Sequence, residues 1–590
     1  MKRKVKMAIQ PPSFRPTVVG THYAAATGHY LGTAAAMRIL DGGGNAVDAG
    51  VTAAMALAIL QPDMVSFAGV APTLIYLKKE DRVISLAGLG YWPKATDINR
   101  LIAEAKNIGA GEHVPEGLLR TVMPAAPATH IEALRRYGTI SFEQAATAAM
   151  EIARDGFAVY PLLASNIEYT VDQFARWPDN AKVFLPGGKP LKVGEVLRQE
   201  DLARSIFGMI EAERNARGDR DKKLRAVHDH FYRGPIAHAI AEYHKRHDGF
   251  VTKDDLAGFE VPVENSLTVR YRGFDVHSCD VWCQGIVLLE TLKILEGYDL
   301  KALGHNSVAY VHTVNQALNL AFADREAYSG DPKFVNVPRA GMLSDAYAIK
   351  QRTRINMQRA FATLPDPGYP EGAPAPYLLH ERVREKSRGV GNQALQPGTI
   401  YGCVIDREGN GYSATLSDPQ YDTPIISGTG LAISSRGCQS RLTPGHPSVV
   451  APGKRPRLTP NPSLAFRDGK LFMAFGTPGG DVQSQAMLQV FLNVVEFGMP
   501  VQQAVETSRM SSWNFPNSFA PHRYHPARLN VENTLPAATV DALKVLGHDV
   551  DVWPQFPAEN AGVCAIMVHP DTGQKHAGAD PRREGYAGAW

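Results

Sequence analysis

The stretch Gly398-Thr399-Ile400-Tyr401-Gly402-Cys403-Val404-Ile405 marks the sharpest change of pattern in the chain. Before it, residues 364–398 form an irregular segment rich in Pro and Gly. After it come a predicted strand, a polar turn at Asp406–Asn410 and a second strand at Gly411–Leu416. Thr399 thus stands at the first position of a buried strand. A chain that cut itself there would expose an N-terminal Thr, whose α-amino group can act as the base for its own hydroxyl.

The turn between the two predicted strands decides which residues face each other. Its sequence suits a three-residue loop with Gly409 in the left-handed conformation. Counting outward from that loop pairs Thr399 with Ser417, with Cβ atoms about 5 Å apart. Ser417 could then hold the Thr399 hydroxyl in place. Alternatively Ser417 only ends its strand, because a different turn type would shift the partner by one residue.

A second candidate element is the sequence Phe475-Gly476-Thr477-Pro478-Gly479-Gly480-Asp481, between a predicted strand at Lys470–Phe475 and a helix from Ser484. Two glycines before a helix let successive backbone N–H groups point at one spot and bind an anion. In acyl transfer, Gly479 and Gly480 would form the oxyanion hole. A tight turn from strand to helix fits the same residues equally well.

Composition indicates an ordinary globular enzyme. The chain has 590 residues, 44% hydrophobic and 21% charged, with a net charge of +3 that is too small to indicate nucleic-acid binding. The basic start Met1–Lys6 is not followed by an apolar core. The longest apolar run, Val51–Leu60, is shorter than the roughly 20 residues of a membrane helix. We therefore expect a soluble, cytoplasmic protein that binds neither nucleic acid nor membrane.

The chemistry-bearing residues give no sign of a cofactor or a metal. Five cysteines are an odd number spread over a long chain, so a disulfide framework is not expected. Cys279 and Cys283 have no second pair to complete a zinc site. The chain also has no Gly-x-Ser-x-Gly elbow, Walker loop or dinucleotide fingerprint.

The remaining pattern mixes helices and strands throughout. The Ala-rich segment 24–60 has helical spacing on both sides of the glycines at 42–44, and residues 73–86 read as two strands joined by a turn. Further helices are predicted at 142–154, 203–214, 236–247, 311–328 and 484–497, and further strands at 550–553 and 562–569. This mixture is typical of a layered α/β or α+β enzyme.

Nine ordered motifs, which together span nearly the whole chain, resemble the γ-glutamyltranspeptidase superfamily of N-terminal nucleophile hydrolases, including its acylase and oxamate-amidohydrolase-like branch. These motifs are DGGGNAVDA at 41–49, ARDGF at 153–157, FYRG at 231–234, TKDDL at 252–256, ADREAY at 323–328, GDP at 330–332, GKRP at 453–456, TPGG at 477–480 and GADPR at 578–582.

The resemblance implies an α+β fold, a four-layer αββα sandwich. It implies self-cleavage between Gly398 and Thr399, giving a heavy chain 1–398, with 364–398 as a flexible processing linker, and a light chain 399–590. Both chains would stay associated in one core, and a dimer of such pairs is left open. Thr399 would attack an amide with its α-amino group as base, while the N–H groups of Gly479 and Gly480 hold the oxyanion. Water or an amine would then take the acyl group.

The chain departs from the family's glutamyl enzymes at the positions that recognise the substrate. Segment 87–93 reads AGLGYWP and lacks the Arg that binds the α-carboxylate. Gln439 replaces the acidic residue for the α-amino group, and Arg436 replaces an amide. Of two carboxylate-binding serines only the hydroxyl of Thr459 remains, next to Leu458. Ser417 replaces the second Thr, Pro419 replaces an Asn, and segment 439–454 is shortened.

These departures predict a threonine amidohydrolase or acylase acting on a small non-glutamyl amide. Arg436 could bind a substrate carboxylate, or it could form an internal salt bridge. Tyr91 and Trp92 could line an apolar acyl pocket, or they could belong to the core. Two other hypotheses stay open. One is a γ-glutamyl hydrolase or transpeptidase with an altered pocket, and the other is a catalytically inactive binding scaffold of the same fold.

Overall fold

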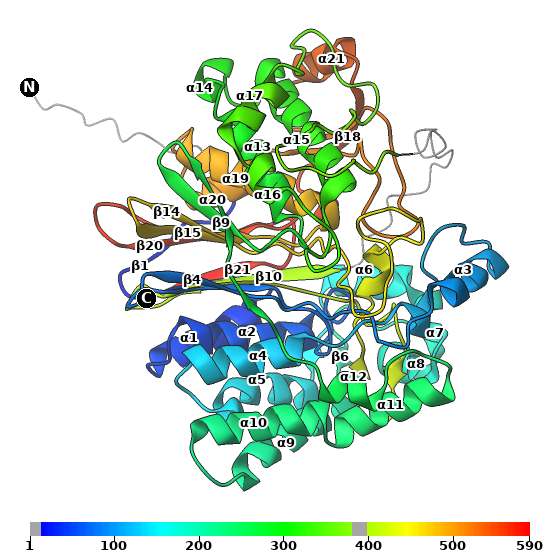
Figure 1. The fold of residues 1–590 in the computed structure, drawn as a ribbon. Coiled ribbons are helices and arrows are strands. Elements are labelled where there is room, and N and C mark those ends of the chain that lie inside the picture. The colour runs from blue at the N-terminus through cyan, green and yellow to red at the C-terminus, as the bar shows by residue number, and fades with distance from the viewer. Residues whose placement is uncertain (1–12, 380–397) are drawn as a thin grey trace, which may run out of the picture.

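Two seven-stranded antiparallel sheets lie face to face at the centre of the molecule (Figure 1). The computed structural model describes residues 13–379 and 398–590. The first sheet has the order β1 (Val18–Gly20), β20 (Lys575–Ala579), β19 (Cys564–Val568), β15 (Lys470–Gly476), β14 (Ser463–Arg467), β9 (Phe274–Ser278) and β8 (Leu267–Tyr271). The second has the order β21 (Tyr586–Ala589), β2 (Ala24–Thr27), β10 (Thr399–Ile405), β11 (Gly411–Ser417), β3 (Thr73–Leu77), β4 (Arg82–Leu86) and β7 (Val263–Glu264).

Helices cover the outer face of each sheet, which makes four layers (Figure 1). Against the second sheet lie α1 (Tyr30–Asp41) and α2 (Ala46–Leu60). Outside them lie α4 (Ala126–Tyr137) and α5 (Phe142–Asp155), followed by α9 (Glu200–Asn215), α10 (Arg220–Tyr232) and α11 (Pro235–Arg246). Against the first sheet lie α13 (Gly285–Leu295), α19 (Gln483–Val495) and α20 (Val501–Glu506), and α15 (Val308–Tyr328) and α17 (Asp345–Arg352) pack on α13. The expected αββα sandwich is confirmed.

Smaller elements complete the fold. The remaining helices are α3 (Ile98–Asn107), α6 (Pro161–Tyr169), α7 (Val171–Ala175), α8 (Pro178–Phe184), α12 (Lys253–Ala257), α14 (Leu300–Leu303), α16 (Arg339–Met342) and α21 (Ala537–Val545). The remaining strands are β5 (Phe157–Ala158), β6 (Val196–Leu197), β12 (Ile425–Ile426), β13 (Leu431–Ala432), β16 (Met510–Ser512), β17 (Arg528–Glu532) and β18 (Asp549–Trp553). Short 3₁₀ turns include η3 (Arg436–Gln439) and η4 (Gly480–Val482).

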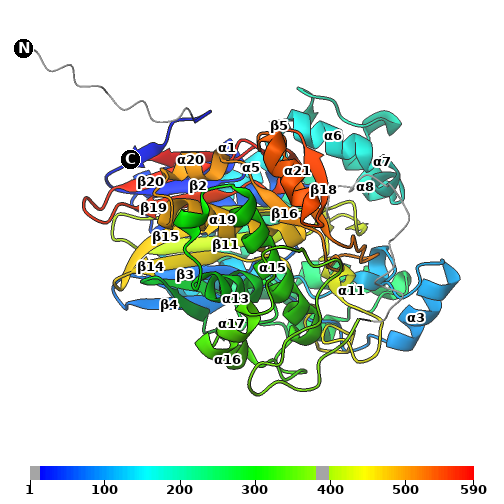
Figure 2. The same ribbon diagram turned by 90° about the horizontal axis from the view of Figure 1, so that it is seen from above.

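Both sheets contain strands from before and from after residue 399, and these strands pair directly with each other. β10 pairs with β2, β11 with β3, β14 with β9 and β20 with β1. Seen from above, segments from both ends of the sequence lie side by side (Figure 2). A break in the chain at residue 399 would therefore leave both parts within the same two sheets.

Strands β10 and β11 are entirely buried because both of their faces are covered, one by the first sheet and the other by helices. Tyr401 and Cys403 of β10 face the first sheet, while Ile400 and Val404 face the helices. Helix α2 is small-residue-rich and buried along its whole length, so it approaches the sheet closely. A Cβ on its Gly50 would lie 2.2 Å from the Tyr412 ring.

The structure corrects one sequence expectation. Ala24–Thr27 forms the strand β2, not part of a helix, because it lies between β10 and β21 in the sheet. Its alanines are fully buried, and their small side chains suit close packing in the centre of a sandwich. The helical pattern begins only at Tyr30, after His29 caps α1. Within the predicted processing linker, residues 364–379 form no helix or strand, and 380–397 lie outside the described residues.

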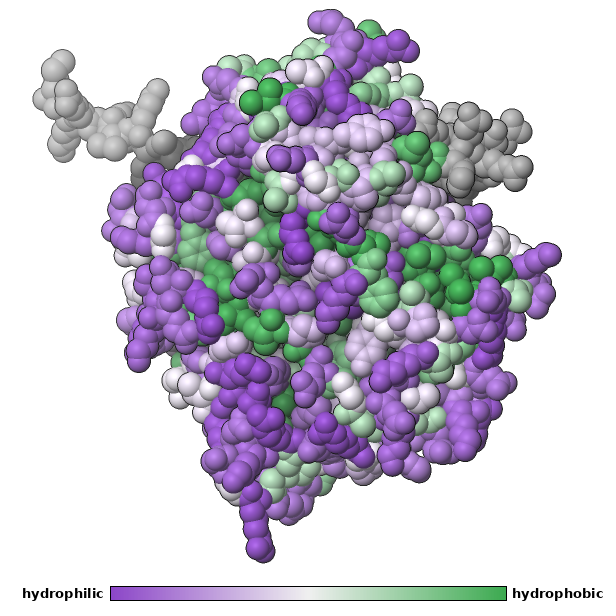
Figure 3. Space-filling view, viewed as in Figure 1, coloured by the Kyte–Doolittle hydropathy of each residue, from purple (hydrophilic) through white to green (hydrophobic). Residues whose placement is uncertain are grey.

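The surface matches the layering. In Figure 3 the helical layers present mainly hydrophilic residues, and hydrophobic residues gather mostly at the height of the sheets. All five cysteines are buried and unpaired. Within residues 13–379 and 398–590, the helices are all too short or too polar to span a bilayer.

Candidate active site

The hairpin β10–β11 brings two hydroxyls together. Gly409 has φ +89°, as a three-residue loop requires, and the register pairs Thr399 with Ser417. Their hydroxyl oxygens lie 2.7 Å apart, and the Thr399 residue is only 1% exposed. Thr399 shares a face of the strand with Tyr401, so its side chain points toward the first sheet. The pairing predicted from loop length is confirmed.

The peptide bond between Gly398 and Thr399 is held by two donors. The Gly398 carbonyl oxygen accepts a hydrogen bond from the Ser417 hydroxyl at 2.5 Å and from Nη2 of Arg436 at 2.8 Å. Arg436 Nη2 also donates to the Ser417 hydroxyl oxygen. Gly398 itself lies against another backbone, since a Cβ there would be 2.0 Å from the Cα of Met64. Close approach therefore requires a glycine at this position.

Arg436 begins the 3₁₀ turn η3 and has no exposed surface. Its Nε lies 2.8 Å from a carboxylate oxygen of Asp418, and its guanidinium stacks over the Phe519 ring at 5.2 Å. Burial raises the pKa of the Asp418 carboxyl, and the positive charge of Arg436 opposes that shift. Asp418 also has φ +96°, a strained conformation for a residue with a side chain.

The Gly-Gly pair occupies the turn from β15 to α19. Gly479 and Gly480 both have positive φ, +121° and +55°, which favours glycine. A Cβ on Gly476, at the end of β15, would lie 2.2 Å from the Tyr401 ring. Because Tyr401 follows Thr399 by two residues, this contact places the turn over the start of β10.

A buried polar shell holds the glycine turn in place. Nε2 of Gln284 donates to the Gly480 carbonyl oxygen at 2.7 Å. Asp481 forms a salt bridge with Arg325, and neither side chain has any exposed surface. Asp481 also accepts hydrogen bonds from the backbone N–H and the hydroxyl of Ser518, at 2.7 and 2.6 Å. Such a shell fixes the direction of the backbone donors, as an oxyanion hole requires.

The other sequence-predicted residues lie in three settings. Gln439 and Thr459 contact each other, with Gln439 Nε2 2.9 Å from the Thr459 hydroxyl, and both are buried. Trp92 is fully buried in a hydrophobic cluster and donates from Nε1 to the Ser440 hydroxyl at 3.0 Å. Tyr91 packs with its ring 5.6 Å from that of Phe259. A role of any of these residues in binding substrate stays a prediction.

Sequence reasoning missed the partners that orient these groups. Asp418 follows Ser417 directly, and a charged residue at the end of an otherwise buried strand is the signal that could have identified it. Gln284, the N-cap of α13, gave no comparable signal, and Arg325 of α15 appeared only within the ADREAY motif with no role assigned to it, because both are remote in sequence from the glycine pair.

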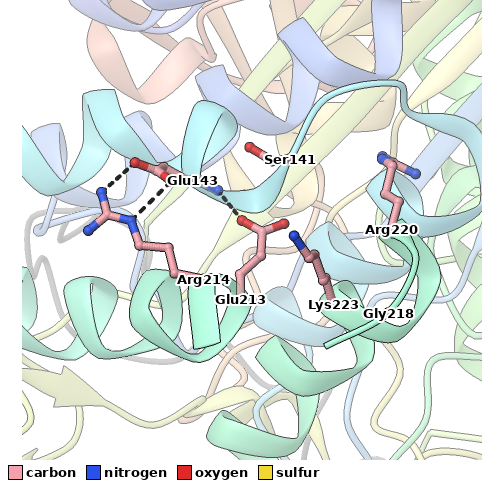
Figure 4. Close-up of a pocket in the computed structure, with 7 residues that line it drawn as sticks. All are labelled: Ser141, Glu143, Glu213, Arg214, Gly218, Arg220 and Lys223. Atoms are coloured by element: carbon pink, nitrogen blue, oxygen red, sulfur yellow. Dashed lines mark hydrogen bonds and ion pairs between the residues drawn. The ribbon is translucent and has the colours of Figure 1, made fainter. Parts of the chain in front are cut away.

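A separate cavity of about 340 Å³ lies in the outer helical layer, between α5, α9 and α10 (Figure 4). The Glu213 carboxylate there caps α5 by accepting from the backbone N–H groups of Phe142 and Glu143, both at 2.8 Å. Glu143 is in turn paired with Arg214. The acidic side chains that line this cavity therefore hold the helices together.

The family model Gamma-glutamyltranspeptidase matches residues 32–590. The chain is 29% identical to the acylase ACY 1 proenzyme of Pseudomonas sp. (strain SE83), covering 94% of this chain and 91% of that protein. It is also 29% identical to the glutathione hydrolase proenzyme of Bacillus subtilis (strain 168), covering 98% and 94%.

Two solved structures resemble the chain over nearly its whole length. LmbA2991HD superposes with a TM-score of 0.90 at 32% identity, covering 98% of this chain and 100% of that one. Cephalosporin acylase from Bacillus halodurans superposes with a TM-score of 0.83 at 26% identity, covering 99% of each chain. The chain is equally similar in sequence to an acylase and to a glutathione hydrolase, and this similarity does not select a substrate.

Proposed function

Because the chain belongs to the γ-glutamyltranspeptidase family of N-terminal nucleophile hydrolases, we propose that it is a self-processing threonine amide hydrolase whose nucleophile is Thr399. The observation that carries this proposal is the Thr399 hydroxyl, buried at the first position of β10 and 2.7 Å from the Ser417 hydroxyl. Relatives of both kinds are named proenzymes, which supports synthesis as an inactive precursor.

In the proposed mechanism, cleavage after Gly398 leaves a light chain that begins with Thr399. Its free α-amino group, with an ordinary pKa of about 7.7 to 8.0, takes the hydroxyl proton as the oxygen attacks an amide carbonyl. The backbone N–H groups of Gly479 and Gly480 stabilise the oxyanion. The α-ammonium group returns the proton to the nitrogen of the departing amine, and water or a second amine then releases the acyl group from Thr399.

The proposed substrate is a small non-glutamyl amide. An amino-acid head group needs an acidic partner for its ammonium group, yet Gln439 is neutral and bonded to Thr459. Asp418 is nearby but is paired with Arg436. Burying an ammonium group without a partner costs several kcal/mol, which disfavours a γ-glutamyl substrate.

Intact mass spectrometry tests the nucleophile. The wild-type chain is expected to yield two species that divide between Gly398 and Thr399, while Thr399→Ala stays a single chain of 590 residues. Thr399→Ser keeps a hydroxyl and serves as the matched control, with cleavage expected at the same bond. An uncut wild-type protein, or a Thr399→Ala variant cut at the same bond, would rule the proposal out.

A substrate panel separates the remaining alternatives. Purified, cleaved enzyme is incubated with γ-glutamyl anilide and with aliphatic, aromatic and dicarboxylic monoamides. Turnover of the non-glutamyl amides supports the proposal, and turnover of γ-glutamyl anilide alone favours the glutathione-hydrolase alternative, which the equally similar relative supports. Self-cleavage without turnover of any amide would favour a binding scaffold.

A further inference from the structure

In the uncleaved chain the base used during turnover does not yet exist. The nitrogen of Thr399 is still part of the peptide bond to Gly398, and an amide nitrogen has no available lone pair to accept the hydroxyl proton. Self-cleavage therefore needs another route for that proton and another donor for the developing oxyanion. Among the described residues the glycine turn at 479–480 makes no hydrogen bond to Gly398, whereas Ser417 and Arg436 both bind the Gly398 carbonyl oxygen.

The hydrogen-bond directions around this carbonyl follow from donor counting. A carbonyl oxygen only accepts, so the single proton of the Ser417 hydroxyl points to Gly398. In the 2.7 Å contact between the two hydroxyls, Thr399 must then be the donor. The Thr399 proton already points toward Ser417, the next oxygen on the way to the carbonyl. The contacts thus form a continuous relay from Thr399 through Ser417 to the Gly398 oxygen.

Arg436 donates hydrogen bonds to both oxygens between which the second proton of this relay moves. Its Nη2 donates to the Ser417 oxygen and, at 2.8 Å, to the Gly398 oxygen. Its position is fixed by the Asp418 carboxylate at 2.8 Å and by the Phe519 ring. Because the guanidinium is fully buried, its charge is little screened by water and stabilises a negative oxygen strongly.

We propose that Arg436 is a catalytic residue of self-cleavage: its charge stabilises the negative charge that develops on the Gly398 carbonyl oxygen until the proton relayed by Ser417 reaches that oxygen. This rests on the function proposed above. Thr399 Oγ1 bonds to the Gly398 carbonyl carbon as its proton passes to Ser417 and the Ser417 proton passes to the carbonyl oxygen. The carbon–nitrogen bond then breaks and that proton moves to the Thr399 nitrogen, leaving an ester and a free amine. Water hydrolyses the ester, giving the Gly398 carboxylate and restoring the Thr399 hydroxyl.

The test follows self-cleavage of the full-length chain in time after cell-free synthesis, on denaturing gels. Arg436→Met is expected to slow cleavage about 100-fold or more, the usual effect of removing one oxyanion donor. Arg436→Gln restores a neutral donor and is expected to give an intermediate rate. The matched control is Arg120→Met, which also removes a buried guanidinium paired with an aspartate, Asp422 at 2.8 Å. It is expected to cleave within a few-fold of wild type.

Circular dichroism against the uncut Thr399→Ala chain identifies variants that fold. Should Arg436→Met not fold, the rate of Arg436→Gln decides. The role of Arg436 is overturned if a folded Arg436→Met variant cleaves at the wild-type rate. If that variant does not fold, the same result for a folded Arg436→Gln variant overturns it. So does an Arg120→Met variant that is slowed as much as the Arg436 variant, because the loss would then reflect general loosening. A wild-type chain that never cleaves would instead refute the function proposed above.

Discussion

The hydroxyls of Thr399 and Ser417 lie 2.7 Å apart because the loop between β10 and β11 has three residues and pairs these two positions across the hairpin. Since Ser417 must donate its proton to Gly398 O, Thr399 can only donate to Ser417. The Thr399 hydroxyl, the proposed nucleophile, is therefore oriented before any cleavage has taken place.

Removing the Ser417 hydroxyl should separate processing from folding. Ser417→Ala is expected to slow self-cleavage about 100-fold, because it deletes both a donor to the Gly398 oxygen and the acceptor of the Thr399 proton. Ser417→Thr keeps the hydroxyl and should cleave at a rate near wild type. The time course of cleavage on denaturing gels gives both rates. Equal rates for Ser417→Ala and wild type would contradict the relay.

The glycine turn should matter for turnover. Gly480→Ala is expected to lower kcat about 100-fold, since a side chain at φ +55° strains the backbone and misdirects the N–H donors. Gly469→Ala, at φ +70° with open space around it, carries similar backbone strain in the β14–β15 turn and should leave kcat unchanged. Steady-state kinetics of the cleaved enzymes measure both. If kcat falls equally in both variants, backbone strain alone accounts for the effect.

The neutral residue at 439 should limit the choice of substrate. Gln439→Asp places a carboxylate where the resemblance puts the acid for the α-amino group. It is expected to raise kcat/KM for γ-glutamyl anilide relative to non-glutamyl amides, because the ammonium group gains a partner. Gln439→Glu, whose carboxylate is on a longer side chain, serves as the control and should raise this ratio of kcat/KM values less. An unchanged ratio of the two kcat/KM values would speak against recognition at this position.

Asp63 should make the stability of the fold depend on pH. It is fully buried, and burial raises the pKa of its carboxyl to about 6, from an ordinary value of 3.8. Between these values only the folded state holds the proton. The free energy of unfolding should therefore decrease as pH rises through this window, by up to about 3 kcal/mol.

Urea unfolding at pH 4.5 and pH 7 measures this effect. The experiment uses the uncut Thr399→Ala variant, so that a single chain unfolds. Asp63→Asn keeps the acceptor for Asn166, which lies 2.5 Å from the Asp63 carboxylate, but cannot ionise. The variant should lose less stability than its parent between the two pH values. Equal losses would show that Asp63 does not titrate as described.

The sequence by itself determined the features that depend on local geometry. Loop length and the left-handed Gly409 fixed the pairing of Thr399 with Ser417, and two consecutive glycines before a helix indicated the turn at Gly479 and Gly480. Motif order indicated the layered fold. These signals are local because backbone conformation and strand register follow from neighbouring residues.

Only the tertiary structure decided what surrounds the Gly398 carbonyl and which segment completes the sheet. Arg436 is 38 positions from Gly398, and no periodicity relates the two, so their contact depends on how η3 packs against the end of β11. In the same way Ala24–Thr27 became a strand because β10 and β21 lie on either side of it. Long-range packing supplies these partners, and the sequence carries no local pattern for it.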